Sequence, residues 1–307
     1  MIYKRSVVLL STAVLVLGCA RRTSLDVAIE GANQSAWEQA SPGLLQTLQA
    51  ENASLEIIVL GNQDEVGLVT GYATPRVLAS RFRSDRFAYP LHLAPEGGTA
   101  ATRQQIHKQE LLAGEELCWL ADRLEAYLIQ VNGSAVLAWV DESGKETGQE
   151  STIVWSASNG HGYKSLGRMA IDAGMASEDS MSLDRLRSLH LSHPQELSEL
   201  MLKNPRYIMF RELSPVEVLE GSRGCPLIPG VSLAADPRYE TGALFLIEPT
   251  DGSEPFLGLV HDGGAAIVGP QRLDRYFGIG DSAMSVAGTT AIPATVSRVE
   301  VGNLAKE

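Results

Sequence analysis

The sequence predicts a mainly β protein of the α+β class, with its strands gathered toward the C-terminus. The last third of the chain carries short apolar runs separated by turn residues, which is typical of strands. Helical spacing of apolar residues is strongest in the middle of the chain, between residues 163 and 203. The length of 307 residues suffices for one large or two modest domains with apolar cores.

Residues 1–19 are predicted to be a targeting segment rather than part of the fold. Two cations precede the apolar run 7–17, which is too short to span a bilayer comfortably. The segment ends at Gly18-Cys19, and a small residue before cysteine is typical of a lipoprotein signal. An ordinary signal peptide with an incidental cysteine is the alternative. We expect a membrane anchor through lipidated Cys19, and Ala20 favours the periplasmic face of an outer membrane.

The next segment is polar, and residues 20–35 are expected to form a tether between lipid and domain. Ser41-Pro42 is expected to open a short helix that ends near Gln49. Residues 55–60 and 66–72 are predicted as two strands on either side of a polar turn.

In the middle of the chain, Thr102 is a candidate N-cap for a helix that ends near Leu112. Asn132-Gly133 and residues 142–145 both have the composition of hairpin turns. Gly174 is placed to cap the C-terminus of a helix. Further helices are predicted at 163–173, 183–191 and 194–203. Strands are predicted at 207–211, 244–248, 257–261, 265–268 and 295–301.

The chain is acidic, with a formal net charge of −12, although residues 76–86 are rich in arginine. We expect no nucleic-acid partner, because such binding relies on Lys and Arg to neutralise phosphates. Cys118 and Cys225, in segments assigned below to different domains, are expected to be free, buried thiols. The histidines share no metal-ligand spacing, so we expect neither a metal nor another cofactor.

The most informative stretch is residues 261–281. It contains five glycines, which permit turns and close approaches that a Cβ would forbid. Asp262 and Asp274 lie on either side of the apolar segment 265–267. This spacing alone fits a Gly-rich surface loop with solvated acids as well as it fits a site.

Residues 261–281 resemble the Asp-Thr-Gly and Arg-x-Asp-x-Phe/Tyr-x-Gly pattern of the lytic murein transglycosylase A family. Earlier landmarks resemble those of the family and follow in the family order, over roughly residues 70–290. They are Gly71-Tyr72-Ala73-Thr74-Pro75, Gln130-Val131-Asn132-Gly133-Ser134, residues 159–167, residues 204–210, and Pro226-Leu227 with residues 232–236.

The resemblance implies a double-psi β-barrel into which a second, mostly β domain is inserted. We expect the barrel at 20–75 and 215–307, and the insert at 76–214. A groove between the two domains would hold an elongated ligand. The implied partner is the glycan strand of peptidoglycan, and the implied oligomeric state is a monomer.

The resemblance also implies lyase chemistry on the β-1,4 bond between N-acetylmuramic acid and N-acetylglucosamine. Asp274 matches the acid that protonates the leaving oxygen and then, as a carboxylate, accepts the proton of the sugar's C6 hydroxyl. The C6 oxygen closes on C1 and leaves a 1,6-anhydro end without water. Asp262 matches the first Asp of the pattern; it either assists Asp274 in catalysis or is a structural turn carboxylate.

Five further residues are implied to bind substrate. Thr74 matches a groove threonine whose hydroxyl would bond Asp274 or the sugar. Tyr72 either stacks on a sugar ring or packs as a strand tyrosine. Arg272 pairs with Asp262, with a peptide carboxylate, or in a surface salt bridge. Gln130 and Ser134 match positions in the inserted domain that bind sugar amides and hydroxyls.

Asn159 and His161 match the inserted domain too, and Asn159-Gly160 is equally suited to a turn. The chain departs from the family pattern at four positions, none of which removes the acid. They are Ala73, Ala135, Gly263 and Val268, the last at a family lysine. An enzyme is therefore the leading hypothesis, and a non-catalytic peptidoglycan-binding lipoprotein is the alternative. An aspartic peptidase is a weaker third, because Asp262-Gly263-Gly264 lacks a hydroxyl and a partner half.

Overall fold

The computed structural model describes residues 23–50, 55–60, 65–214, 217–264 and 267–302. Cys19 and the predicted targeting segment lie outside these residues, as do Ala265 and Ala266 of the Gly-rich stretch. In the described part of the chain, no helix is both long and apolar enough to cross a membrane.

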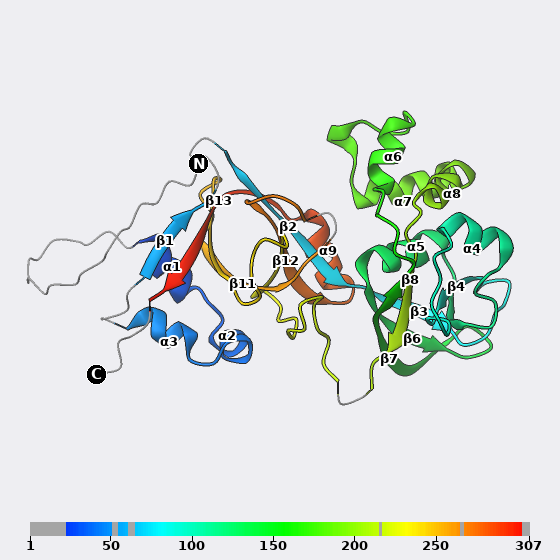
Figure 1. The fold of residues 1–307 in the computed structure, drawn as a ribbon, viewed down its shortest axis with the longest axis horizontal. Helices are drawn as coiled ribbons and strands as arrows, with labels where there is room; N and C mark the ends of the chain where they lie inside the picture. The colour runs from blue at the N-terminus through cyan, green and yellow to red at the C-terminus, as the bar shows by residue number, and fades with distance from the viewer. Residues whose placement is uncertain (1–22, 51–54, 61–64, 215–216, 265–266, 303–307) are drawn as a thin grey trace, which may run out of the picture. The chain divides into compact units, whose positions relative to one another are not determined.

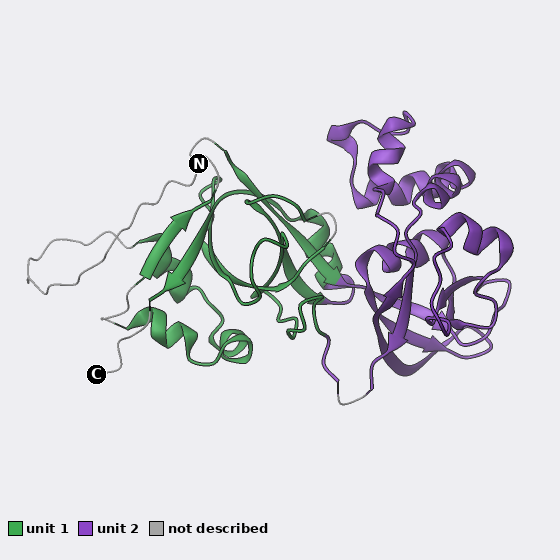
Figure 2. Cartoon of the chain, in the orientation of Figure 1, with its two compact units in different colours: residues 1–73, 220–278, 283–307 green, residues 74–219, 279–282 purple. Residues whose placement is uncertain are grey.

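The chain divides into two compact units (Figure 2). Unit 1 comprises residues 1–73, 220–278 and 283–307, and unit 2 comprises residues 74–219 and 279–282. The insert was expected at 76–214. The short segment 279–282, expected in the barrel, groups instead with unit 2, because the N–H of Gly280 donates to the carbonyl of Thr74 over 2.9 Å.

Unit 1 is built around a closed barrel of six strands. In spatial order they are β13 (Ala291–Val301), β10 (Leu244–Pro249), β11 (Phe256–Asp262), β9 (Ser232–Ala235), β12 (Arg272–Ile279) and β2 (Gly67–Thr74). Pairing of β2 with β13 closes the ring, which is visible in Figure 1. β1 (Leu55–Val59) adds to β13 as an antiparallel edge strand. Within the ring, β9 and β11 run parallel.

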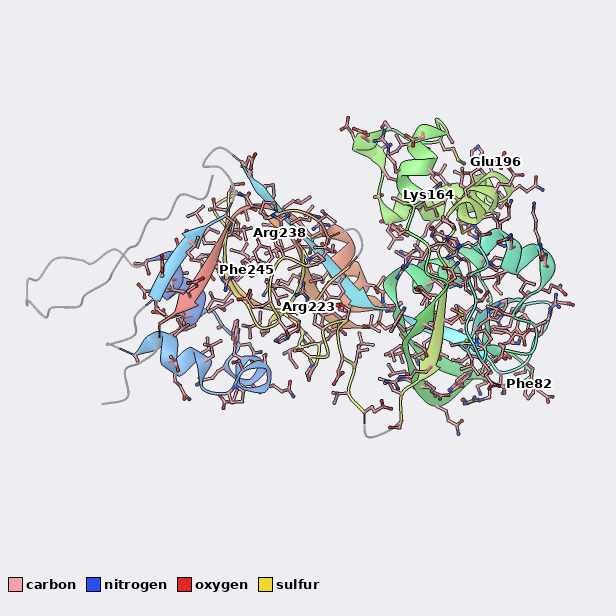
Figure 3. All side chains as sticks on the ribbon, in the orientation of Figure 1. Phe82, Lys164, Glu196, Arg223, Arg238 and Phe245 are labelled. Atoms are coloured by element: carbon pink, nitrogen blue, oxygen red, sulfur yellow. The ribbon has the colours of Figure 1, made fainter. Side chains whose placement is uncertain are left out.

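The barrel interior is filled by alternate residues of every strand, because successive side chains point to opposite faces. Phe245, labelled in Figure 3, lies at its centre together with Val69 and Leu273, all three without solvent exposure. The predicted fold class, a mainly β α+β protein with a barrel and an inserted second domain, is confirmed.

Three short helices cover the outer face of β10 and β11, contrary to the expected tether at 20–35. They are α1 (Ser24–Glu30), α2 (Gln34–Ala40) and α3 (Leu44–Gln49). Leu25, Ile29 and Trp37 are buried against Leu246 and Leu257. The tether prediction was wrong because polar composition hid two capped helices: Thr23 accepts from Asp26 N and Asn33 from Ala36 N.

Unit 2 contains a six-stranded sheet and five α-helices among its described residues, of which α5 (Arg123–Asn132) packs on the sheet. The sheet order is β4 (Tyr89–His92), β5 (Glu116–Leu120), β3 (Arg76–Ser80), β6 (Ser134–Val140), β7 (Glu146–Ser158) and β8 (Ile208–Glu212). The helices are α4 (Arg103–Gln109), α5 (Arg123–Asn132), α6 (Leu166–Asp172), α7 (Leu183–Ser192) and α8 (Pro194–Lys203), with a 3₁₀ turn at Glu178–Ser180. An apolar cluster including Tyr127, Leu189 and Leu197 joins α5 to α6, α7 and α8.

Local turn chemistry was predicted with mixed success. The hairpin at 142–145 is confirmed, with Asp141 N donating to Lys145 O between β6 and β7. Asn132-Gly133 is not a hairpin: Asn132 ends α5, and Gly133 caps it at a φ of 85°. The strand predicted at 265–268 is wrong for Ile267 and Val268, which are not in a strand. Strand β12 and helix α9 (Asp281–Thr289) follow them along the chain.

Cys118 is buried and Cys225 is partly exposed, and both are free thiols.

The interior of unit 2 holds a polar cluster around Tyr207. The Tyr207 hydroxyl and His92 Nδ1 are 2.8 Å apart, and the buried guanidinium of Arg103 lies 5.0 Å from the Tyr207 ring. Burial lowers the pKa of His92 to about 4, although the nearby Glu116 opposes this shift. His92 is therefore neutral in the folded protein near pH 7 and is protonated more readily once unfolding exposes it to water.

We predict that Trp37→Ala lowers the free energy of unfolding by about 3–5 kcal/mol, because it leaves a cavity between α2 and the barrel. Urea unfolding followed by circular dichroism measures the change. Gln39→Ala, an exposed change on the same helix, serves as the control. A loss below about 1 kcal/mol for Trp37→Ala would mean that the N-terminal helices do not belong to the core.

We predict that His92 makes the protein acid-sensitive. The folded pKa of His92 is about 4, below its usual 6.5, so between those values the unfolded state binds more protons. Stability from this residue falls as the pH drops from 6.5 toward 4, by about 2–3 kcal/mol at pH 4.5. The check is urea unfolding at pH 7 and pH 4.5 for wild type and His92→Gln. An equal pH dependence in both proteins would contradict the assignment.

Candidate active site

The candidate site lies on the outer face of two neighbouring barrel strands, β2 and β12. Val69 and Leu273 point into the barrel, so the alternation of side chains places Thr70, Arg272 and Asp274 on the opposite face. Packing of the barrel interior therefore directs these three polar side chains to the outer face.

Asp274 is the centre of a small polar network. Its side chain is 16 % exposed and forms an ion pair with Arg272, whose Nη1 lies 2.5 Å from Oδ1. The Thr70 hydroxyl donates to the same carboxylate oxygen, and Arg272 Nη2 donates to Thr70 Oγ1 over 2.8 Å. Two side chains, one from each strand, therefore hold one carboxylate while leaving part of it accessible.

One expectation about this network needs correction, and one residue is added to it. Arg272 was expected to pair with Asp262, with a peptide carboxylate or at the surface, and it pairs with Asp274. The threonine described as donating to Asp274 is Thr70, four residues before Thr74 on β2. Thr74 is buried at the end of the strand, and its carbonyl accepts from Gly280. Thr70 could have been found from the sequence, because residues four apart share one face of a strand.

Gly71, between Thr70 and Tyr72, is required by a close approach. A Cβ at this position would lie 2.7 Å from Cα of Ala287 on α9 and 2.8 Å from Cε2 of Phe277 on β12. Any larger residue would push α9 or β12 away from β2. Gly71 thus allows α9 and β12 to pack closely against β2.

Asp262 ends β11 and has a different environment. Its Oδ1 accepts the backbone N–H groups of Ser222, over 2.7 Å, and of Gly263, over 2.8 Å. Gly221 must lack a side chain here, because a Cβ would lie 2.4 Å from the carbonyl oxygen of His261. Of the two interpretations of Asp262, these contacts favour the structural turn carboxylate.

The charges of both carboxylates, Asp262 and Asp274, affect the pKa of Tyr72. Burial and then the charge of Asp262 raise the pKa of Tyr72 well above its usual value, with a smaller contribution from Asp274. Its ring packs on Tyr276 with centroids 5.1 Å apart, and its buried hydroxyl has no hydrogen-bond partner of normal geometry among the described residues. These contacts fit a packed strand tyrosine that stays protonated.

Arg223, labelled in Figure 3, and Asp236 organise the adjoining loops, and neither was predicted as a site residue. Arg223 donates to the carbonyls of Asp262, Ala235 and Asp236 at 2.9 to 3.1 Å. Asp236 accepts the N–H groups of Gly269 and Arg238, and these bonds lower the pKa of Asp236 to about 2. No local sequence pattern predicts the role of Arg223 or Asp236, because most of the partners of these two residues are backbone groups distant in sequence.

The predicted residues of the inserted domain all fall in unit 2. Gln130 is buried in α5 beside Tyr207, while Ser134 begins β6 and is half-buried. Asn159 is a structural residue: its amide donates to the carbonyls of Ala101 and Pro205, and its oxygen accepts from Tyr207 N. His161 Nε2 contacts the carbonyl of Ala100 over 2.9 Å.

The departures from the family pattern leave the Asp274 network intact. Val268, at the family lysine position, is 67 % exposed, and Ala73 and Ala135 are buried. Within the described ranges, no group of three or more His, Cys, Asp or Glu residues is placed to hold a metal ion.

Two family profiles match the chain, one on each unit. The MltA specific insert domain matches residues 97–211, within unit 2, and the 3D domain matches residues 231–300, almost all within unit 1. Asp262, Arg272 and Asp274 fall inside the 3D domain.

Curated relatives have matching names. The chain is 29 % identical over 231 residues to the membrane-bound lytic murein transglycosylase A of Escherichia coli K12, covering 71 % of this chain and 61 % of that protein. It is 29 % identical over 245 residues to the Vibrio cholerae protein of the same name, covering 75 % of this chain and 64 % of the relative. The matches therefore span less than two thirds of these relatives.

Solved structures show the same architecture. A membrane-bound lytic murein transglycosylase from Agrobacterium tumefaciens superimposes with a TM-score of 0.70 at 25 % identity, covering 85 % of this chain and 83 % of that one. Escherichia coli MltA with bound chitohexaose superimposes with a TM-score of 0.73 at 24 % identity, covering 91 % and 88 %. From both domain matches, its relatives and its fold, the chain belongs to the membrane-bound lytic murein transglycosylase A family.

Proposed function

We propose that this protein is a lytic murein transglycosylase that cleaves peptidoglycan between N-acetylmuramic acid and N-acetylglucosamine and leaves 1,6-anhydromuramoyl ends. The observation that carries the proposal is the Asp274 carboxylate, held on the outer barrel face by Thr70 and Arg272 and still partly accessible. The names of the curated relatives support the same reaction.

The chemistry needs one carboxyl group in two protonation states. Asp274 in its acid form gives its proton to the glycosidic oxygen as the C1–O bond breaks and positive charge develops on the ring. The resulting carboxylate accepts the proton of the C6 hydroxyl while the C6 oxygen bonds to C1. No water is consumed, and the proton that Asp274 lost is restored to it.

Asp262 supports a one-acid reaction rather than hydrolysis. A hydrolase uses a second carboxylate, either to activate water or as a nucleophile. Asp262 Oδ1 already accepts two backbone N–H groups, which hold this carboxylate in a turn. The internal C6 hydroxyl replaces water as nucleophile, and intramolecular placement gives it a high effective concentration.

Arg272 has a role in this cycle. Its ion pair with Asp274 suits the carboxylate form, which accepts the proton in the second step. The donor form in the first step requires the pair to loosen when the saccharide binds. Arg272 then becomes available for an anionic or hydroxyl group of the substrate, and Thr70, bonded to both partners, keeps the carboxyl group in place.

We further infer that lipidated Cys19 anchors the protein at the periplasmic face of the outer membrane. Gly18 before the cysteine and the apolar run preceding it support this assignment. The relatives' names, which include "membrane-bound", support association with a membrane.

We predict that Asp274→Asn lowers the release of anhydromuropeptides at least a hundredfold, because the amide can neither donate nor accept the transferred proton. Purified wild type and variant are incubated with peptidoglycan sacculi, and soluble products are identified by mass spectrometry. Wild-type products with reducing ends would reject lyase chemistry in favour of hydrolysis. If neither protein releases products while both sediment with sacculi, the protein is a non-catalytic binder.

We predict that Thr70→Val lowers the rate of product release more than Thr74→Val. Thr70 bonds both Asp274 and Arg272, and a hydrogen bond to a charged group contributes about 1.5–3 kcal/mol, or roughly tenfold or more in rate. The initial rate on sacculi and the melting temperature of each variant are measured together. A large rate loss confined to Thr74→Val would show that the family threonine, not Thr70, supports the acid.

A further inference from the structure

The loop between β3 and β4 has an unusual surface for this acidic protein. We call residues 81–86, Arg-Phe-Arg-Ser-Asp-Arg, the basic loop. All six are exposed, and Phe82 is 72 % exposed at the periphery of unit 2 (Figure 3). The chain as a whole carries a net charge of −12, so three arginines within six residues form a local reversal of charge.

The arginines of the basic loop lack carboxylate partners. Elsewhere in unit 2, Arg76, Arg168 and Arg187 each form ion pairs with Asp or Glu side chains. None of the ion pairs in the described part of the chain includes Arg81, Arg83 or Arg86. Their positive charge is therefore available to an external anion.

Aromatic rings hold these guanidinium groups in place. Arg81 lies 3.8 Å from the centroid of the Trp139 ring, and Arg83 and Arg86 lie 5.5 and 5.2 Å from the rings of Trp119 and Phe87. A guanidinium stacked by its face keeps the N–H groups of its edge for hydrogen bonds, and its fork geometry matches a phosphate.

The backbone presents Phe82 rigidly. The Phe82 N–H donates to Ser80 Oγ over 3.1 Å, and the same hydroxyl donates to the Phe82 carbonyl over 2.7 Å. Ser84 and Phe87 close the rest of the loop, with Ser84 N donating to Phe87 O and Phe87 N to Ser84 Oγ. A large apolar side chain thus stands in water on an ordered loop, which is typical of an interaction site.

We propose that the basic loop is a docking surface for anionic phospholipid, with arginines 81, 83 and 86 on lipid phosphates and Phe82 inserted at the level of the headgroups. Phe82 has no hydrogen-bonding group, which suits an acyl boundary better than a saccharide or a peptide stem. The otherwise acidic chain is repelled by an anionic surface, so this patch determines which part of unit 2 faces the bilayer. The assignment concerns a different surface from Asp274 and does not depend on the proposed activity.

The test uses residues 20–307 without lipid, which include every described residue, and co-sedimentation with vesicles. We expect binding to phosphatidylcholine vesicles that contain 30 % phosphatidylglycerol, little binding to pure phosphatidylcholine, and loss of binding in 0.5 M NaCl. The triple variant Arg81→Gln, Arg83→Gln, Arg86→Gln should reduce the partition coefficient at least tenfold. Phe82→Ser should reduce it about threefold or more, which corresponds to the transfer of one partly buried aromatic ring.

Matched controls separate the patch from general charge and hydrophobicity. Lys108→Gln, Lys164→Gln, Lys203→Gln removes three exposed charges from unit 2, and Leu191→Ser removes an apolar side chain that is 83 % exposed. Both controls should bind as wild type does, and all variants should keep the wild-type melting temperature. Equal losses in the controls, equal binding to both kinds of vesicle, or loop variants that lose binding to sacculi but not to vesicles would each overturn the proposal.

Discussion

The site depends on one geometric constraint, the alternation of side chains along two paired barrel strands. The closed barrel must fill its interior with apolar groups, and Val69 and Leu273 meet this need. Their neighbours in sequence are thereby directed outward, and Thr70 meets Asp274 and Arg272 there. A one-residue slip of β2 or β12 would exchange the two faces, so the pairing of these two neighbouring barrel strands also brings Thr70 to Asp274 and Arg272.

The two carboxylates of the Gly-rich stretch illustrate how environment separates roles. Asp262 accepts backbone N–H groups from a tight turn, which holds its side chain in place. Asp274 is held by side chains instead, and side-chain partners can exchange when a ligand arrives. Two aspartates of the same stretch are therefore held by different kinds of partner.

The second unit contains buried polar side chains in addition to its apolar clusters. Asn159 and Asn204 bind backbone groups of distant loops, and Tyr207 joins His92 in the interior. Such groups are costly to bury unless they are paired, and here they cross-link the ends of strands and helices. The basic loop lies on the exposed surface of the same unit and is separate from these buried cross-links.

The sequence by itself determined the family, the fold class and the helix at 194–203 with its proline at the first turn, because these depend on local patterns and ordered motifs. It could not separate a tether from capped helices at residues 24–40, nor a hairpin glycine from a helix cap at Gly133. Only the tertiary structure decided that Arg272 and Thr70 contact Asp274. Thr70 lies 204 positions before Asp274, and strand pairing, which no local spacing encodes, brings the two together. Arg272 lies two positions before Asp274 on the same strand.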